Sequence, residues 1–365
     1  MAGTRIICLG ILMASCLAIF FYRGDMLISM SRDSLQVQSR RHLSMRVLTR
    51  DHASRMHAVR QRHTDTMPNI RHHAAGGKLE LPEGAALVSS SPQESIDNRY
   101  SSRVPHGAYL AMCLVVKDQG DDLREWVDYH RSIGVEKLYI FDDNSTIPSL
   151  VVVEDLVDAG VVEYEAVESF EHPSGKVQLW AYDTCIQRYR GLHQWMAFID
   201  VDEYFIITDS NVTVLPDLLK DYMDYGALVV NWQMFGSSGY ANRPPGGTLE
   251  SYVDCFEVNH LENKHIKTIA NLDFVECTDR DPHHFLYMDG KHAVNTAYQV
   301  VEGAKADNVV TDRLLLHHYV TKSLEQYISK IARGSAMGNR KSIEFFDFVQ
   351  SQATEKCMAA LHLGR

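Results

Sequence analysis

Short runs of hydrophobic residues alternate with stretches of helical periodicity between residues 109 and 200. The first run, Tyr109 to Val116, has eight hydrophobic residues in a row, which is typical of a strand buried on both faces. The next segment, from about Asp121 to Ile133, repeats its apolar positions at helical spacing, and Gly134 follows as a stop. This pattern predicts a buried strand followed by an amphipathic helix.

The same alternation continues to residue 199 and predicts the fold class. Further strands are expected at 137–141, 161–166 and 195–199, and further helices at 149–159 and 176–190. Strands that alternate with helices form parallel sheets whose faces are covered by the helices. We therefore expect an α/β fold with a Rossmann-like, mostly parallel sheet and flanking helices.

The pattern is looser beyond residue 203. Residues 232–247 are predicted to form a long loop, and 313–316 a short buried strand. A helix is expected from Leu324 to about Arg333, because Ser323 and Gln326 fit a capping box. The apolar stripe of this helix consists of Leu324, Tyr327, Ile328 and Ile331.

Carboxylates follow two of the predicted strands. Asp142 and Asp143 come directly after one strand, and Asp200 and Asp202 follow the run that ends at Ile199. In an open α/β sheet these strand ends line one crevice, and side chains two apart in a continued strand point the same way. Four clustered carboxylates are costly without a cation, so we expect a divalent metal site; solvated carboxylates at a strand end are the alternative.

Charge is distributed unevenly along the chain. Residues 1–73 contain 11 Arg, no Lys and 4 Asp, a net charge of +7, whereas the whole chain carries −11. The remaining residues therefore carry −18. Nucleic-acid binding requires Lys and Arg against phosphates, so the acidic body is not expected to bind nucleic acid.

The N-terminal region predicts a membrane anchor. Ile6 to Tyr22 is a run of 17 residues without a charge, between Arg5 and Arg23, and no small-residue cleavage site follows it. We expect an uncleaved signal anchor in residues 1–23; a cleaved signal peptide is the alternative. Residues 24–106 are rich in Arg, His and Ser and read as a flexible stem, and 107–365 form the folded domain.

Five cysteines, at positions 113, 185, 255, 277 and 357, lie in the predicted folded domain. None forms a Cys-x-x-Cys pair, so a zinc knuckle is not expected. A lumenal domain with five cysteines holds at most two disulfides and one free thiol, and the sequence leaves their pairing open. Asn211 and Asn144 match the N-glycosylation acceptor pattern, and we expect only Asn211 to carry a glycan.

Several ordered motifs resemble glycosyltransferases of family 92 and the related family-2-like group. The matching stretches are 113–118, Glu125-Trp126, Tyr129-His130, Gly134-Val135, 141–145, 198–204, Trp232, 235–239, His284-Phe285 and 318–323. These enzymes are type II membrane proteins of the secretory pathway with a GT-A catalytic domain. The resemblance implies a single-pass protein, in the Golgi by our expectation, with a lumenal catalytic domain.

The resemblance also implies a nucleotide-diphosphate sugar as donor, bound through Mn²⁺ or Mg²⁺, and a glycan or glycoconjugate hydroxyl as acceptor. On the donor side it implies Asp202 and His318 as metal ligands, with Asp200 on the metal or the ribose. His317 is the competitor of His318. Asp142, with Asp143 beside it, would bind the nucleoside, and Lys117 or Lys322 would neutralise phosphate.

An inverting transfer requires a base beside the acceptor hydroxyl. The candidates are Glu250, Asp254, Asp281 and His284, of which Glu250 ranks first because it follows the predicted acceptor-side loop; His284 is retained beside it. Two other functions remain open. A metal-dependent phosphoesterase or nucleotide-sugar hydrolase uses similar carboxylates, and an inactive lumenal carbohydrate-binding homologue keeps the same fold.

Overall fold

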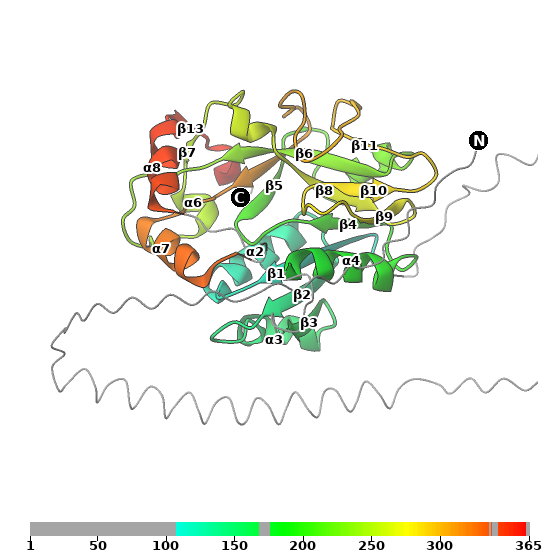
Figure 1. Cartoon of the computed structure of the whole chain (residues 1–365), viewed down its shortest axis with the longest axis horizontal. Coiled ribbons are helices and arrows are strands. Elements are labelled where there is room, and N and C mark those ends of the chain that lie inside the picture. The colour runs from blue at the N-terminus through cyan, green and yellow to red at the C-terminus, as the bar shows by residue number, and fades with distance from the viewer. Residues whose placement is uncertain (1–106, 168–175, 336, 338–341, 363–365) are drawn as a thin grey trace, which may run out of the picture. The chain divides into compact units, whose positions relative to one another are not determined.

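The computed structural model describes residues 107–167, 176–335, 337 and 342–362 of the chain (Figure 1). The predicted anchor and stem lie outside these residues, and no helix within them is long and apolar enough to cross a membrane.

The first half of the folded region alternates strands and helices as predicted. In chain order the elements are β1 (Leu110–Val116), α2 (Gly120–Ser132), β2 (Lys137–Asp143), α3 (Leu150–Asp158), β3 (Val162–Val167), α4 (Val177–Tyr189) and β4 (Trp195–Phe198). Each boundary lies within two residues of the expected one. Gly134 ends α2 with a positive φ of 101°, a conformation that glycine adopts without steric cost.

The second half is more irregular. It contains β5 (Glu203–Ile207), α5 (Leu215–Leu219), η2 (Lys220–Tyr222), β6 (Ala227–Met234), α6 (Thr248–Ser251), β7 (Asp254–Cys255), η3 (Leu261–Lys264), β8 (Ile266–Asn271), β9 (Val275–Thr278), β10 (Phe285–Tyr287), β11 (Ala293–Val294), β12 (Leu314–His318), α7 (Leu324–Arg333), α8 (Ile343–Gln352), β13 (Glu355–Lys356) and η4 (Ala359–His362).

The central sheet is mixed but mostly parallel, in the order β3-β2-β1-β4-β8-β6-β12-β5, with β11 beside β6. Strands β1 to β4 are parallel to one another. Strand β8 is antiparallel to both neighbours, β4 and β6, and β5 is antiparallel to β12. Because β8 runs against β4, the beginning of β8 lies beside the end of β4.

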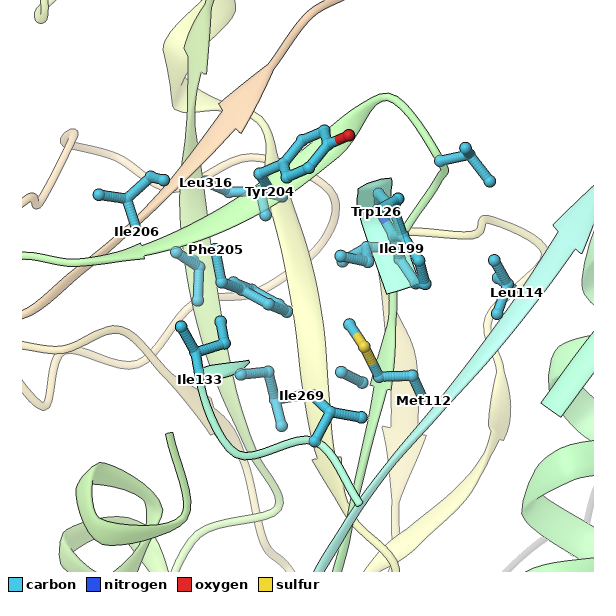
Figure 2. Packing of buried hydrophobic residues seen from close by; sticks show 14 of the residues in the cluster. Met112, Leu114, Trp126, Ile133, Ile199, Tyr204, Phe205, Ile206, Ile269 and Leu316 are labelled. Atoms are coloured by element: carbon cyan, nitrogen blue, oxygen red, sulfur yellow. The ribbon is translucent and has the colours of Figure 1, made fainter. Parts of the chain in front are cut away.

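Hydrophobic clusters cover both faces of the sheet. Alternate residues of β1 face opposite ways: Met112 and Leu114 join the cluster under α2, whereas Ala111 and Val115 join the cluster under α4. Figure 2 shows part of the first cluster, which contains Trp126 of α2 together with residues from β1, β5, β8 and β12. Burial on both faces explains why β1 is an unbroken apolar run.

Two disulfides, Cys113–Cys185 and Cys255–Cys357, link segments far apart in sequence, and Cys277 belongs to neither of them. This agrees with the limit of two disulfides and one thiol. The first disulfide joins β1 to α4, and the second joins β7 to the C-terminal segment beside β13.

Three local expectations were wrong. Asp200 and Asp202 do not continue the strand; β4 ends at Phe198, and a turn with buried Val201 leads into β5. The expected loop at 232–247 begins later, because Trp232 to Met234 belong to β6. Helix α7 has the predicted bounds and capping box, but Ile328 is 54% exposed, so its apolar stripe is not buried throughout.

Candidate active site

A pocket of about 270 Å³ opens at the edge of the sheet where β1, β4 and β12 end. Six elements and loops contribute charged or aromatic side chains to it. The principal lining residues are Lys117, Gln119, Gln178, Asp200, Asp202, Trp232, Asp281, His283, His318, Lys330 and Arg333. The pocket thus lies where the sequence pattern placed a ligand crevice, at the carboxyl ends of parallel strands.

Asp200 is held by two partners from distant segments. Gln178 of α4 donates to Asp200 Oδ1 over 2.7 Å, and Lys267 of β8 donates to Oδ2 over 2.8 Å. The Lys267 side chain is fully buried. Burial lowers the pKa of Lys267, but Asp200 and Glu203 together hold it well above its usual range. Asp200 therefore serves as counter-ion to a buried, charged lysine.

Glu203, the third acidic residue of the motif, is fully buried. Its Oε2 accepts the backbone N–H of Asp200 over 2.8 Å and lies 3.3 Å from Lys267 Nζ. Burial raises the pKa of Glu203 to about 8, against the opposing effect of Lys267. The hydrogen bond from the Asp200 backbone to Glu203 closes the turn. Lys267 contacts both Asp200 and Glu203, so these three residues together hold the turn in its conformation.

Asp202 contacts the C-terminal part of the chain. Lys330 of α7 donates to Asp202 Oδ2 over 2.5 Å, and His318 Nε2 lies 3.8 Å from Oδ1. Burial raises the pKa of Asp202, but Lys330 and His318 outweigh it and hold that pKa well below its usual range. Asp202 is therefore a buried carboxylate in its ionised form, as a metal ligand must be.

The structure distinguishes His318 from His317. The two are neighbours in β12, so their side chains point to opposite faces of the sheet. His318 pairs across the strands with Glu203, packs on Trp232 with ring centroids 4.3 Å apart, and lines the pocket. His317 is fully buried against Tyr319, and burial lowers its pKa to about 3. Only His318 faces the predicted site.

Asp202 and His318 lie close enough to each other to approach one cation. Metal bonds of about 2.0–2.1 Å allow two ligand atoms of one ion to lie up to about 4 Å apart, and here the separation is 3.8 Å. In the described part of the chain, no group of three or more His, Cys, Asp or Glu side chains is arranged to hold a metal. The expected third ligand, Asp200, is occupied by Lys267 and Gln178.

The carboxylates at the end of β2 do not join those after β4, contrary to the expectation of one four-carboxylate site. Asp142 accepts hydrogen bonds from the backbone of Ser145 and Ser149 and from the Tyr164 hydroxyl. Asp143 is buried and pairs with Lys117 at 3.2 Å. Strand β1 separates β2 from β4, and of these residues only Lys117 lines the pocket.

Lys322, the other lysine predicted to meet phosphate, lies elsewhere. It is only 4% exposed and pairs with Asp122 at 3.0 Å. It lines a second, much smaller cavity of about 20 Å³ that also borders Asp202, Lys330 and Arg333. The cations that line the main pocket are instead Lys117, Lys330 and Arg333.

Of the four candidates for a catalytic base, Asp281 alone belongs to the pocket lining. Glu250 is exposed on α6, and His284 pairs with Asp279 at 3.2 Å. Asp254 pairs with Lys356. Asp281 Oδ1 accepts the backbone N–H of His283 over 2.7 Å, which fixes the loop between β9 and β10 at the pocket rim.

Sequence reasoning missed Gln178, Lys267, Lys330 and Arg333 as site residues. Lys267 carried a usable signal, because it interrupts an otherwise strand-like segment, Ile266 to Asn271, that is buried throughout. Lys330 and Arg333 lie on the predicted helix, where exposed basic residues near a C-terminus are ordinary. Nothing local marked them as pocket residues.

Comparison with known proteins identifies the family. The profile described as glycosyltransferase family 92 matches residues 109–332. A family 92 protein of Ricinus communis is 32% identical over 230 residues, which cover 61% of this chain and 37% of that protein. A family 92 protein of Arabidopsis thaliana is 24% identical over 262 residues, covering 69% and 41%. The chain thus spans about two fifths of the length of these relatives.

A relative with a more specific name matches over a shorter stretch. The galactan β-1,4-galactosyltransferase GALS3 of Arabidopsis thaliana is 27% identical over 165 residues, which cover 42% of this chain and 33% of that protein. Among solved structures, S. aureus TarS has a TM-score of 0.33 at 13% identity, covering 58% of this chain and 37% of TarS. That likeness is low.

The profile match extends from the start of β1 to α7 and includes every strand that borders the pocket. It covers well over half of the 365 residues. The chain belongs to glycosyltransferase family 92.

Proposed function

We propose that the protein transfers a sugar from a nucleotide-diphosphate sugar to a hydroxyl of a glycan or glycoconjugate, with a divalent metal and inversion at the anomeric carbon. The observation that carries this proposal is the composition of the pocket in a family 92 chain. Three carboxylates, two histidines and three cationic side chains line a cavity at the carboxyl ends of parallel strands.

On the donor side, Asp202 and His318 would hold the metal. When bound, Mn²⁺ or Mg²⁺ supplies Lewis-acid stabilisation of the leaving diphosphate. Two protein ligands leave most coordination positions to phosphate oxygens and water, as is usual for Mg²⁺ beside phosphates. Lys117 and Arg333 lie at the pocket wall and would neutralise further phosphate charge through charge-assisted hydrogen bonds. Asp200, fixed by Lys267, is left to accept from a donor hydroxyl.

On the acceptor side, we assign the base to Asp281 in place of Glu250 and His284. A general base has to lie within hydrogen-bond reach of the hydroxyl it deprotonates. Asp281 meets the pocket, and its backbone-bonded loop holds it there. Asp281→Asn is expected to lower kcat about 100-fold or more, whereas Glu250→Gln leaves it near the wild-type value. The reverse result would return the role to Glu250.

The compartment we propose is the Golgi lumen, with the chain anchored as a type II membrane protein. The two disulfides support this, because disulfides persist in oxidising compartments such as the secretory pathway. Asn211 lies exposed in the turn between β5 and α5, where an oligosaccharide is sterically tolerated. Microscopy of the expressed chain and a glycosidase-induced shift in its electrophoretic mobility would test both expectations.

The deciding experiment is a transfer assay with the full-length purified chain. A panel of nucleotide sugars would include UDP-galactose, and the acceptors would include β-1,4-galactan, because a galactan galactosyltransferase is among the relatives. Product mass and released nucleoside diphosphate are measured with Mn²⁺, with Mg²⁺ and with EDTA. We expect acceptor-dependent transfer that EDTA abolishes. Free sugar released equally with and without acceptor would favour a hydrolase, and no turnover would favour an inactive carbohydrate-binding homologue.

A further inference from the structure

Helix α7 brings two cations to the pocket from one side. Lys330 and Arg333 are three residues apart, so they lie on the same face of the helix, and both line the pocket. The Lys330 ammonium donates to Asp202 Oδ2 over 2.5 Å and to the Val320 carbonyl over 2.8 Å. Its side chain is 17% exposed. Lys330 is thus the direct counter-ion of the carboxylate that faces His318.

This contact places Lys330 in competition with a metal. A divalent cation held by Asp202 and His318 would share the carboxylate whose Oδ2 the Lys330 ammonium contacts. Like charges at such short range, in a buried setting, repel strongly. A metal ion without an anionic ligand would therefore meet an occupied and unfavourable site.

A diphosphate reverses this relation. Once the phosphates accompany the metal, the displaced ammonium gains an anionic acceptor of its own. The main pocket and the small cavity behind it both border Lys330, so its flexible stem has space on two sides of Asp202. The same side chain would oppose the metal alone and favour the metal with its diphosphate, which is positive coupling between the two ligands.

We propose that Lys330 is a substrate-gated counter-ion. It occupies Asp202 in the absence of donor, is displaced when metal and diphosphate bind together, and then contacts the phosphate. This inference rests on the proposed donor site but adds an ordered relation that the family assignment does not contain. It predicts that the protein takes up metal efficiently only with the diphosphate.

The test is Lys330→Met, which keeps the length of the side chain and removes its charge. Two affinities are measured: that of Mn²⁺ alone, from the electron paramagnetic resonance signal of free Mn²⁺, and that of inorganic pyrophosphate for the Mn²⁺-saturated protein, by calorimetry. We expect Mn²⁺ alone to bind at least about fivefold more tightly and pyrophosphate about tenfold more weakly. Lys330→Arg, which keeps a cation, should leave the Mn²⁺ affinity near the wild-type value.

Lys220→Met is the matched control, because Lys220 forms an equally direct pair with Asp217 at 2.7 Å and does not line the pocket. It should change neither affinity. If Lys330 only braces α7, Lys330→Met lowers Tm but leaves Mn²⁺ binding unchanged or weaker, and that outcome overturns the inference. Sugar transfer by the wild type together with such a result would reject the gating while retaining the proposed function. If Lys330→Met binds Mn²⁺ more tightly and pyrophosphate more weakly, but the wild type transfers sugar from no donor, the gating is retained and the proposed function is rejected.

Discussion

Two pairs of carboxylates in this protein look alike in sequence and differ in the fold. Asp142 and Asp143 end β2, and Asp200 and Asp202 follow β4, each pair after a run of buried hydrophobic residues. The first pair is already bonded to neighbouring protein groups: Asp142 accepts hydrogen bonds from the backbone of the turn that follows it, and Asp143 pairs with Lys117. The second pair faces the pocket and is balanced by cations from β8 and α7.

The difference teaches that an acidic strand end becomes a ligand site through its long-range neighbours. Beside β4 run β8 and, further along the sheet, β12, which bring Lys267 and His318 to the same edge. Strand β2 has β1 and β3 as neighbours, and its carboxylates are satisfied by residues of nearby turns and strands. A carboxylate that closes its own turn has few lone pairs left for a ligand.

The largest expected effect is a loss of transfer activity on substitution in the β4 pair. Asp202→Asn keeps the side-chain volume and removes a charged ligand, so we expect transfer activity to fall about 1,000-fold and metal-dependent nucleotide binding to be lost. Activity is measured with the donor identified in the transfer assay. Full activity in this variant would remove Asp202 from the site.

A second variant asks what keeps the β4 pair in place. Lys267→Met leaves the buried Glu203 and the Asp200 side chain, which is 36% exposed, without their shared cation. Solvent screens Asp200 and burial already favours protonated Glu203, so we take the lower end of the range for breaking a buried ion pair, about 3 kcal/mol. We expect the free energy of unfolding in urea to fall by that amount. The double variant Lys267→Met, Glu203→Gln should recover part of it, and an absence of recovery would show that the two residues are not coupled.

The third variant addresses the β2 pair. Asp142→Asn weakens three hydrogen bonds to a charged acceptor, so we expect a loss of about 2–4 kcal/mol in unfolding free energy. The Mn²⁺ affinity should stay at the wild-type value. A selective loss of nucleotide binding with unchanged stability would instead restore Asp142 to the donor site.

The smallest effect is expected at Asp143. Its partner Lys117 is about one third exposed, and such a pair contributes about 1 kcal/mol or less. Burial raises the pKa of Asp143, so its charged form gains little from folding. Asp143→Asn should therefore leave the midpoint of urea unfolding nearly unchanged, while it frees Lys117 toward the pocket. A drop in stability comparable to that of Asp142→Asn would mean that both carboxylates are structural.

The sequence by itself determined the elements of the first half and the general place of the site. A buried strand such as β1 is recognisable as an apolar run, and the amphipathic helix α2 is recognisable from the spacing of apolar residues such as Trp126 and Val127. Both patterns are visible because the side-chain periods of strands and helices arise from local backbone geometry. The motif around Asp202 and the capped helix that follows Ser323 were visible for the same reason. Local geometry does not specify which strands become neighbours.

Only the tertiary structure decided which charged residues meet. The antiparallel insertion of β8 places Lys267 beside Asp200, 67 residues away, and α7 returns Lys330 to Asp202 across 128 residues. Asp200 and Asp202 also lie in a turn instead of the expected strand, so the two carboxylates contact different partners. Electrostatic contacts depend on the distance between charges and on their burial, and the local sequence pattern determines neither.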